Sequence, residues 1–228
     1  MFHPTAKMRS VHFQHMINSL ELQAMWDYIQ ENNISGSSDN YHSTEHMAQV
    51  ALIAHEILRY EPHVGKESPE ETLFITVVAC LFHDMGHSLG DQTDEYNIME
   101  AIISFRIWCR QPSIGTRFFL HAAAIESAIR ITEFPYSDKR KPITLSHKVI
   151  RDADILYGLQ FDSRSTVLHK LRKEMARSKP VYTDMSHTDY VNSRIDFLRT
   201  VELFTQYGTE LFNAQIAPHT AAIISERI

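Results

Sequence analysis

Apolar residues recur every three to four positions along almost the whole chain, which places them on one face of a helix. A strand would instead alternate apolar and polar positions. We therefore expect about nine helices, with the last kinked or ended early at Pro218. Their approximate ranges are 20–33, 39–61, 68–82, 94–109, 117–132, 144–159, 163–177, 187–206 and 208–226.

Two of these predicted helices have readable starts. Asp39-Asn40 provides N-cap residues for the second helix. Ser68-Pro69-Glu70-Glu71 starts the third with a cap, a proline in the first turn and acids at the positive helix end. That third helix is apolar on all sides from Leu73 to Phe82, so we expect other helices to surround it. Gly86 is its natural terminator.

Composition supports an all-α fold. Seven glycines and eight prolines in 228 residues are too few for the turns of a β-sandwich or barrel. A hydrophobic content of 43% is enough for one substantial core. We expect one compact domain made of an N-terminal helical extension (1–38), a central core (39–160) and C-terminal helices that pack on it (161–228).

The net charge of -6 argues against nucleic acid as a partner, because binding its backbone needs clustered Lys and Arg. A small anionic substrate is compatible with this charge if a bound metal supplies local positive charge. Cys80 and Cys109 form neither a disulfide framework nor a zinc pattern. No signal peptide and no membrane-spanning stretch is visible, so the expected location is the cytoplasm.

Three polar clusters interrupt the apolar helices. His42 and His46 stand four apart in the second predicted helix, so they are expected to share one face. His83-Asp84 ends the most apolar helix, where polar groups are costly unless compensated. Arg151-Asp152-Ala153-Asp154 lies on another apolar helix. Each cluster alone is commonly a solvated face or a cap. Together they hold the imidazole and carboxylate ligands that suit divalent metals, and they predict a metal site.

In order and spacing these clusters resemble the HD-domain metal-dependent phosphohydrolases, and more finely their cyclic nucleotide phosphodiesterase-like branch. Three motifs over residues 39–160 carry the resemblance. They are Tyr41-His42-Ser43-Thr44-Glu45-His46, His83-Asp84-Met85-Gly86-His87 and Ala153-Asp154-Ile155. The resemblance implies a single HD-domain helical bundle with His46, His83, Asp84 and Asp154 as ligands of a first metal.

The same resemblance assigns further roles. Asp84 would bridge to a second ion, His42 would protonate the leaving alkoxide, and His87 would orient water at the second metal. The branch also has an asparagine after its second-metal histidine. Here the following stretch, 88–97, is longer and acidic, and Asn97 or Glu95 would replace that asparagine.

Four residues are secondary candidates for substrate contact or support of the ligands: His121, Asn97, Arg151 and Asp152. Asp152 and Asp154 are two positions apart, about 200° around a helix, so they cannot both face one ion. Asp154 lies on the same helical stripe as Arg151. We expect Asp152 either to hydrogen-bond to a metal ligand or to be solvated. Arg151 could contact phosphate. His121 could complete a diiron site, or lie at the surface.

The leading hypothesis is a metal-dependent phosphodiesterase or phosphatase that cleaves a small, nucleotide-like phosphate ester by metal-activated water. The cofactor would be one or two divalent ions, drawn from Zn, Mn, Mg, Fe, Ni and Co. A diiron oxygenase that uses His87 and His121, and a non-catalytic nucleotide- or metal-binding module, are the alternatives. Substrate identity and oligomeric state cannot be inferred from the residues.

Overall fold

The computed structural model describes residues 6–62, 68–111, 114–136, 140–159 and 166–225. Within those ranges the chain forms eleven α-helices and one π-helical segment, with no strand, so the all-α prediction is confirmed. The expected number of nine was too low. Two helices were missed, α1 (Ala6–Ser19) and the short α9 (Val181–Asp184). α1 has a weakly amphipathic sequence, whose helical period is hard to read.

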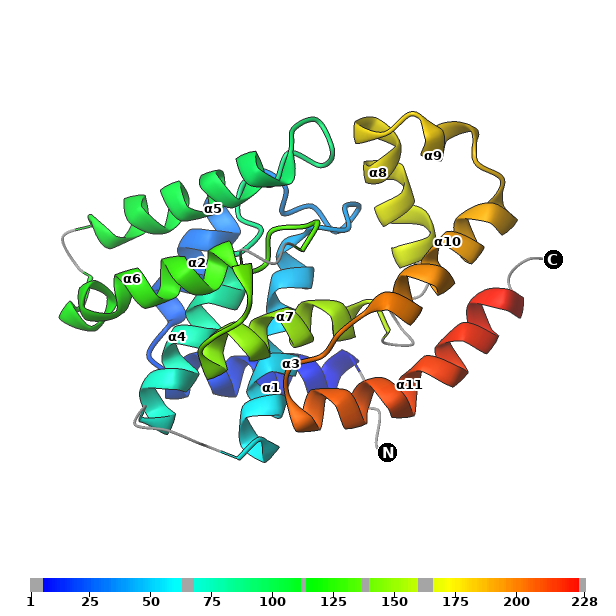
Figure 1. Ribbon diagram of the computed structural model, residues 1–228. Coiled ribbons are helices and arrows are strands. Elements are labelled where there is room, and N and C mark those ends of the chain that lie inside the picture. The colour runs from blue at the N-terminus through cyan, green and yellow to red at the C-terminus, as the bar shows by residue number, and fades with distance from the viewer. Residues whose placement is uncertain (1–5, 63–67, 112–113, 137–139, 160–165, 226–228) are drawn as a thin grey trace.

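The remaining helices fall close to the ranges expected from the apolar stripes, and Figure 1 shows their arrangement. One expected helix, 163–177, consists of a π-helical segment followed by an α-helix, and its expected start at Ser163 lies outside the described residues. The bounds are α2 (Gln23–Asn32), α3 (Thr44–Tyr60), α4 (Pro69–Phe82), α5 (Asp94–Cys109), α6 (Thr116–Arg130), α7 (Leu145–Tyr157), η3 (Thr166–Leu171), α8 (Arg172–Ser178), α10 (His187–Thr200) and α11 (Gln206–Ser225).

Helix α4 is the centre of the bundle. It packs against α3, α6 and α7, and α3 also packs along α7. Every residue from Thr76 to Phe82 is buried, which confirms the prediction that this helix is surrounded. The polar residues that follow it, His83 and Asp84, are therefore buried in the core at the C-terminal end of α4.

Helix α3 begins later than Asp39-Asn40. Ser43 is the N-cap, and its hydroxyl accepts a hydrogen bond from the His46 backbone N–H at 3.2 Å. The backbone N–H of Tyr41 is bound instead by the carboxylate of Glu174, at 2.7 Å. Because this contact holds the chain outside the helix, His42 precedes α3 and does not share a helical face with His46.

The N-terminus of α11 is anchored by two carboxylates from distant parts of the chain. Asp152 on α7 accepts hydrogen bonds from the backbone N–H groups of Phe204 and Thr205, at 3.0 and 2.8 Å, and from the Thr205 hydroxyl at 2.6 Å. Glu61 accepts from the N–H groups of Gln206 and Tyr207, at 3.0 and 2.9 Å. These bonds satisfy N–H groups that a helix start leaves without partners. The helix then continues through Pro218 to Ser225, so the expectation of an early end was wrong.

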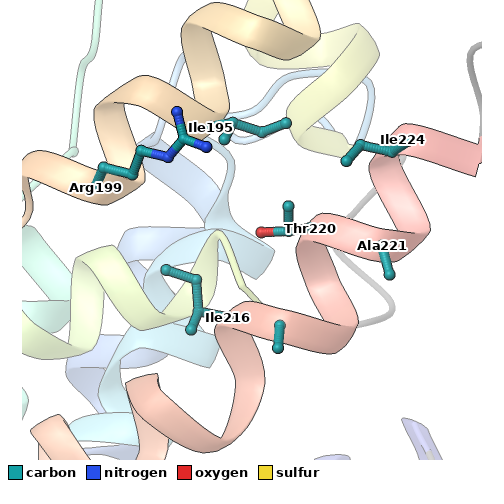
Figure 2. Close-up of a pocket in the computed structure, with 7 residues that line it drawn as sticks. Ile195, Arg199, Ile216, Thr220, Ala221 and Ile224 are labelled. Carbon is teal, nitrogen blue, oxygen red and sulfur yellow. The ribbon is translucent and has the colours of Figure 1, made fainter.

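A shallow apolar groove with a volume of about 470 Å³ lies between α10 and α11 (Figure 2). Figure 2 shows Ile195 and Arg199 facing it from α10, and Ile216, Thr220 and Ile224 from α11. None of the histidines or aspartates of the predicted metal site lines this groove. No helix in the described part of the chain is long and apolar enough to cross a membrane.

Gly208, in the first turn of α11, is a position where a side chain should not fit. A Cβ there would lie 2.8 Å from Asp152 Oδ2 and would also overlap the Thr205 hydroxyl. Helix propensity alone predicts that Gly208→Ala stabilises by roughly 1 kcal/mol. We expect the opposite sign, a loss of about 1–3 kcal/mol, because the substitution overpacks a hydrogen-bonded cap. Thermal unfolding followed by circular dichroism measures it.

Gly115→Ala is the control, since no atom lies within 4 Å of the position of its Cβ. Its melting temperature should fall less than that of Gly208→Ala, because the expected cost is only that of an alanine at the N-cap of α6. A Gly208→Ala protein as stable as the parent would contradict the close approach described for this turn.

Candidate metal centre

Four side chains from three helical segments converge on one point. The Nε2 atoms of His46 and His83 each lie 3.0 Å from Asp84 Oδ2, and 3.2 Å from one another. Asp154 Oδ1 lies 3.2 Å from His46 Nε2 and 3.8 Å from His83 Nε2. The structure therefore brings together all four residues predicted as ligands of a first metal.

Each ligand is placed by a local feature of its helix. His46 lies in the first turn of α3, behind the Ser43 cap. His83 is the C-cap of α4, and Asp84 follows it in the tight turn that ends at Gly86 (φ +79°), a left-handed conformation that favours glycine. Asp154 faces the same point from α7, which packs along both α3 and α4.

The donor set fits a divalent cation. Ligands about 2.0–2.2 Å from one ion lie roughly 3 Å apart in octahedral and about 3.5 Å apart in tetrahedral coordination. The observed separations of 3.0–3.8 Å span that range. Asp84 Oδ2 is buried and has no hydrogen bond of acceptable geometry in the described chain. A buried carboxylate oxygen left in this way is well suited to bind a cation.

The proton positions also suit a ligand set. His83 Nδ1 donates to the Cys80 carbonyl at 2.7 Å, because a carbonyl can only accept, so Nε2 is the ring atom directed at the site and would bind a metal in place of its proton. Burial lowers the pKa of His83, but the charges of Asp84 and Asp154 outweigh it and raise that pKa well above its usual range. Burial raises the pKa of Asp154, and its hydrogen bonds to His46 and His83 reverse this and hold it well below its usual range. The negative field behind both shifts also attracts a cation.

A second group of possible ligands shares Asp84. His42, Asp84 and His87 each offer one ligand atom within 4.8 Å of the others. The rings of His42 and His87 are stacked, with centroids 3.8 Å apart. Burial lowers the pKa of His42, but the charges on Asp84 and Glu174 raise it to about 9. Burial and the neighbouring His42 lower the pKa of His87 to about 3. The stacked pair thus consists of one charged and one neutral imidazole at neutral pH.

Asn97 lies where the sequence prediction put it, beside His87. Its Nδ2 is 2.9 Å from His87 Nε2, and its Oδ1 accepts from the Ser88 backbone N–H at 2.9 Å. The Leu89 N–H donates to the other ring nitrogen of His87 at 3.0 Å. Leu89 has a left-handed φ of 57°, so this contact holds the backbone in a costly conformation. The acidic loop after the His-Asp motif therefore wraps around His87.

Glu174 is the site residue that sequence reasoning missed. It is buried in α8, more than 130 positions from the residues that it binds. One oxygen lies 2.5 Å from His42 Nδ1 and the other accepts the Tyr41 N–H at 2.7 Å. The sequence offered one signal, an acid beside the apolar residues Leu171 and Met175. This signal is weak, because apolar periodicity is hard to recognise over about one turn of helix.

The other three secondary candidates form no hydrogen bond or ion pair with the four predicted ligands in the described part of the chain. Asp152 is fully buried, and its carboxylate binds the start of α11, so the expectation that it supports the ligands or is solvated was wrong. His121 lies 4.0 Å from Glu71 and belongs to neither ligand group of the described residues. Arg151 is buried with its guanidinium carbon 3.5 Å from the Tyr136 ring centroid.

The fold and the site define a class, an all-α bundle whose core can hold a divalent metal between histidines and aspartates. The profile of the HD domain matches residues 44–159, which are 116 of 228 residues and thus just over half of the chain. The protein belongs to the HD-domain family. That family consists mostly of metal-dependent hydrolases. No curated protein and no solved structure matches the chain.

Removal of one ligand should remove the metal. His83→Ala deletes an imidazole that contacts two of the other three ligand residues within 3.2 Å, so we expect metal content after dialysis to fall at least about tenfold. Elemental analysis by mass spectrometry measures it. His121→Ala is the matched control and should keep the parent's metal content. Equal losses in both variants would contradict the ligand set.

The two aspartates of α7 should separate metal binding from stability. Asp154→Asn is expected to lose metal because it removes an anionic ligand. Asp152→Asn should keep the metal but lower stability by about 1–3 kcal/mol, because an amide cannot accept all the hydrogen bonds from Phe204 and Thr205. Metal analysis and thermal unfolding of both variants give the answer. If Asp152→Asn lost metal and Asp154→Asn kept it, the assignment would be reversed.

Proposed function

We propose that this protein is a metal-dependent phosphohydrolase that cleaves a phosphate ester of a small, nucleotide-like substrate. The observation that carries the proposal is the convergence of His46, His83, Asp84 and Asp154 on one point, with His42 beside it. A protein that only binds a metal would need no more than the four ligands. The charged imidazole of His42 beside them is a proton donor, which catalysis requires and binding does not.

The two carboxylates of the ligand set balance the charge of one divalent ion. His46, His83, Asp84 and Asp154 would hold it, and Asp84 would bridge to a second, more weakly held ion, at which His87 would orient water. A bound ion of this kind supplies Lewis acidity and makes water nucleophilic near neutral pH. One or two ions, from Zn, Mn, Mg, Fe, Ni or Co, are compatible with imidazole and carboxylate ligands.

His42 would protonate the leaving alkoxide, which is a poor leaving group without a proton. Glu174 occupies its Nδ1, so Nε2 is the atom that can face a substrate. The pKa of about 9 keeps the imidazole protonated at neutral pH, as a general acid requires. Glu174 would act as a positioning residue, because it fixes the orientation and the protonated state of His42.

The diiron alternative is less well supported by the geometry. It needs His87 and His121 as additional ligands, but His121 lies outside both ligand groups that the described residues form. Both ring nitrogens of His87 already contact the Asn97 amide and the Leu89 N–H. We therefore place hydrolysis ahead of oxygen chemistry.

The direct test is turnover of bis-p-nitrophenyl phosphate and of a panel of nucleotides by the metal-loaded protein. Hydrolysis of at least one of them, abolished by Asp84→Ala with the helical circular dichroism retained, is the expected result. If the metal-loaded protein hydrolyses no phosphate compound, the proposed function is wrong.

His42→Gln should lower kcat about 100- to 10,000-fold, the usual contribution of general acid catalysis, and leave the metal content unchanged. Glu174→Gln should lower kcat less, with KM nearly constant, because His42 remains but is no longer fixed by a carboxylate. Steady-state kinetics with metal analysis on the same samples measures both effects. A smaller effect of His42→Gln than of Glu174→Gln would contradict the assigned roles.

Glu126→Gln is a matched control for the loss of a glutamate carboxylate. Glu126 pairs with Arg106 at the surface, at 2.6 Å. Its removal should change neither kcat nor metal content.

A further inference from the structure

Arg151 is a buried cation that forms no ion pair with a carboxylate in the described part of the chain. Only 5% of its surface is exposed, and no carboxylate of the described chain lies within 4.0 Å of its guanidinium. Its Nε is buried and has no hydrogen-bond partner among the described residues. Burial of an unpaired charge is costly, so a guanidinium in this state strongly favours an incoming anion.

The aromatic neighbours of Arg151 cover the plane of its guanidinium group and not its edge. Its carbon lies 3.5 Å from the Tyr136 ring centroid and 5.0 Å from that of Phe204, so aromatic rings cover the plane of the group. The five N–H donors of a guanidinium lie in that plane and point outward from its edge. Stacking holds the fork in one orientation. One donor is shared with the Tyr136 side chain, and the remaining donors of such a fork can match two oxygens of a phosphate.

This cation lies next to the metal centre. Arg151 and Asp154 are three positions apart on α7, and residues at that spacing are neighbours on a helix, with Cβ atoms about 5–6 Å apart. Tyr136 connects the two, because burial and then the charge of Asp154 raise its pKa, while Arg151 lowers it. An anion on Arg151 would therefore lie beside the phosphate at the metal.

Further aromatic rings lie next to Tyr136. The ring of Phe134 is 45% exposed, with its centroid 5.4 Å from that of Tyr136 and 6.0 Å from that of Phe197. The backbone N–H of Phe134 donates to Asp94 at 2.5 Å, which fixes this segment at the start of α5. An exposed aromatic face beside an anion site suits a nucleobase, because every base can stack on it.

We propose that Arg151, Tyr136 and Phe134 form a subsite for the part of the substrate that is not cleaved, and that this part carries its own phosphate group. The inference rests on the proposed function and names its substrate class, nucleotides with a second phosphate separate from the one hydrolysed. Water cleaves one ester to give an alcohol and inorganic phosphate, and the second phosphate stays on Arg151.

The test compares adenosine 3′,5′-bisphosphate with adenosine 5′-monophosphate on the metal-loaded protein. A charge-assisted bidentate contact should favour the bisphosphate about 10- to 100-fold in kcat/KM, mainly through KM. Arg151→Gln should remove this preference by raising KM for the bisphosphate more than for the monophosphate. Arg199→Gln, on the exposed face of α10, should retain the preference and controls for net charge.

Two results would overturn the subsite. One is a parent protein without preference for the bisphosphate. The other is an Arg151→Gln variant that weakens both substrates equally, as loss of packing against Tyr136 and Phe204 alone would do. If Arg151→Gln does not fold, Arg151→Lys replaces it. Lysine keeps the charge but not the planar fork, so the preference should fall at least about threefold, and a full preference would refute the bidentate contact.

The same comparison by calorimetric binding keeps the two proposals distinguishable. If neither nucleotide is hydrolysed, the proposed function fails for these esters. The subsite is still judged by whether the bisphosphate binds more tightly than the monophosphate, and whether Arg151→Gln abolishes that difference.

Discussion

Two aspartate carboxylates and two imidazoles meet where α3, α4 and α7 pack together, and the rest of the molecule is arranged around that meeting point. Charged groups are costly to bury unless they are paired or coordinate a metal. Here the surroundings are strongly apolar, since the last seven residues of α4 are all buried. The opposite charges raise the pKa of His83 and lower the pKa of Asp154. Each buried charge is therefore compensated only while its partner lies beside it. A divalent ion suits such a cluster, because imidazole and carboxylate groups are both ligands of divalent metals.

The segments that hold His42 and His87 beside the four clustered residues are not regular helix. The chain before α3 forms turns and bends, and Glu174 binds both the Tyr41 N–H and His42 there. The loop after α4 contains left-handed backbone at Gly86 and at Leu89, whose N–H holds His87. Strained backbone persists only where surrounding contacts over-determine it. In this protein it is concentrated between the His-Asp motif and α5, next to the ligands.

Much of the fold and the clustering of His46, His83, Asp84 and Asp154 could be predicted because their signals are local. Apolar periodicity located most helices, and the His83-Asp84 pair was conspicuous because it ends a wholly apolar helix. The start of α3 was misplaced because Asp39-Asn40 and Ser43 are all good caps, and the choice between them depends on a carboxylate more than 130 residues away. Glu174 itself gave no local signal, since one acid in a short helix is ordinary. Long-range hydrogen bonds of this kind are not encoded in any window of the sequence.

Helix α7 shows most clearly why residue type and spacing alone were insufficient. Asp152 and Asp154 are the same residue two positions apart, and helical geometry turns them to opposite sides. The side of Asp154 meets His46 and His83, whereas the side of Asp152 meets the start of α11, in a cap that the missing Cβ of Gly208 accommodates. Arg151, between them along the helix, packs against Tyr136 before α7 and Phe204 before α11. One helix thus carries a residue of the candidate metal site, the anchor of the C-terminal helices and a buried cation. The position of that cation is consequently tied to both Asp154 on the same helix and the segment that leads into α11.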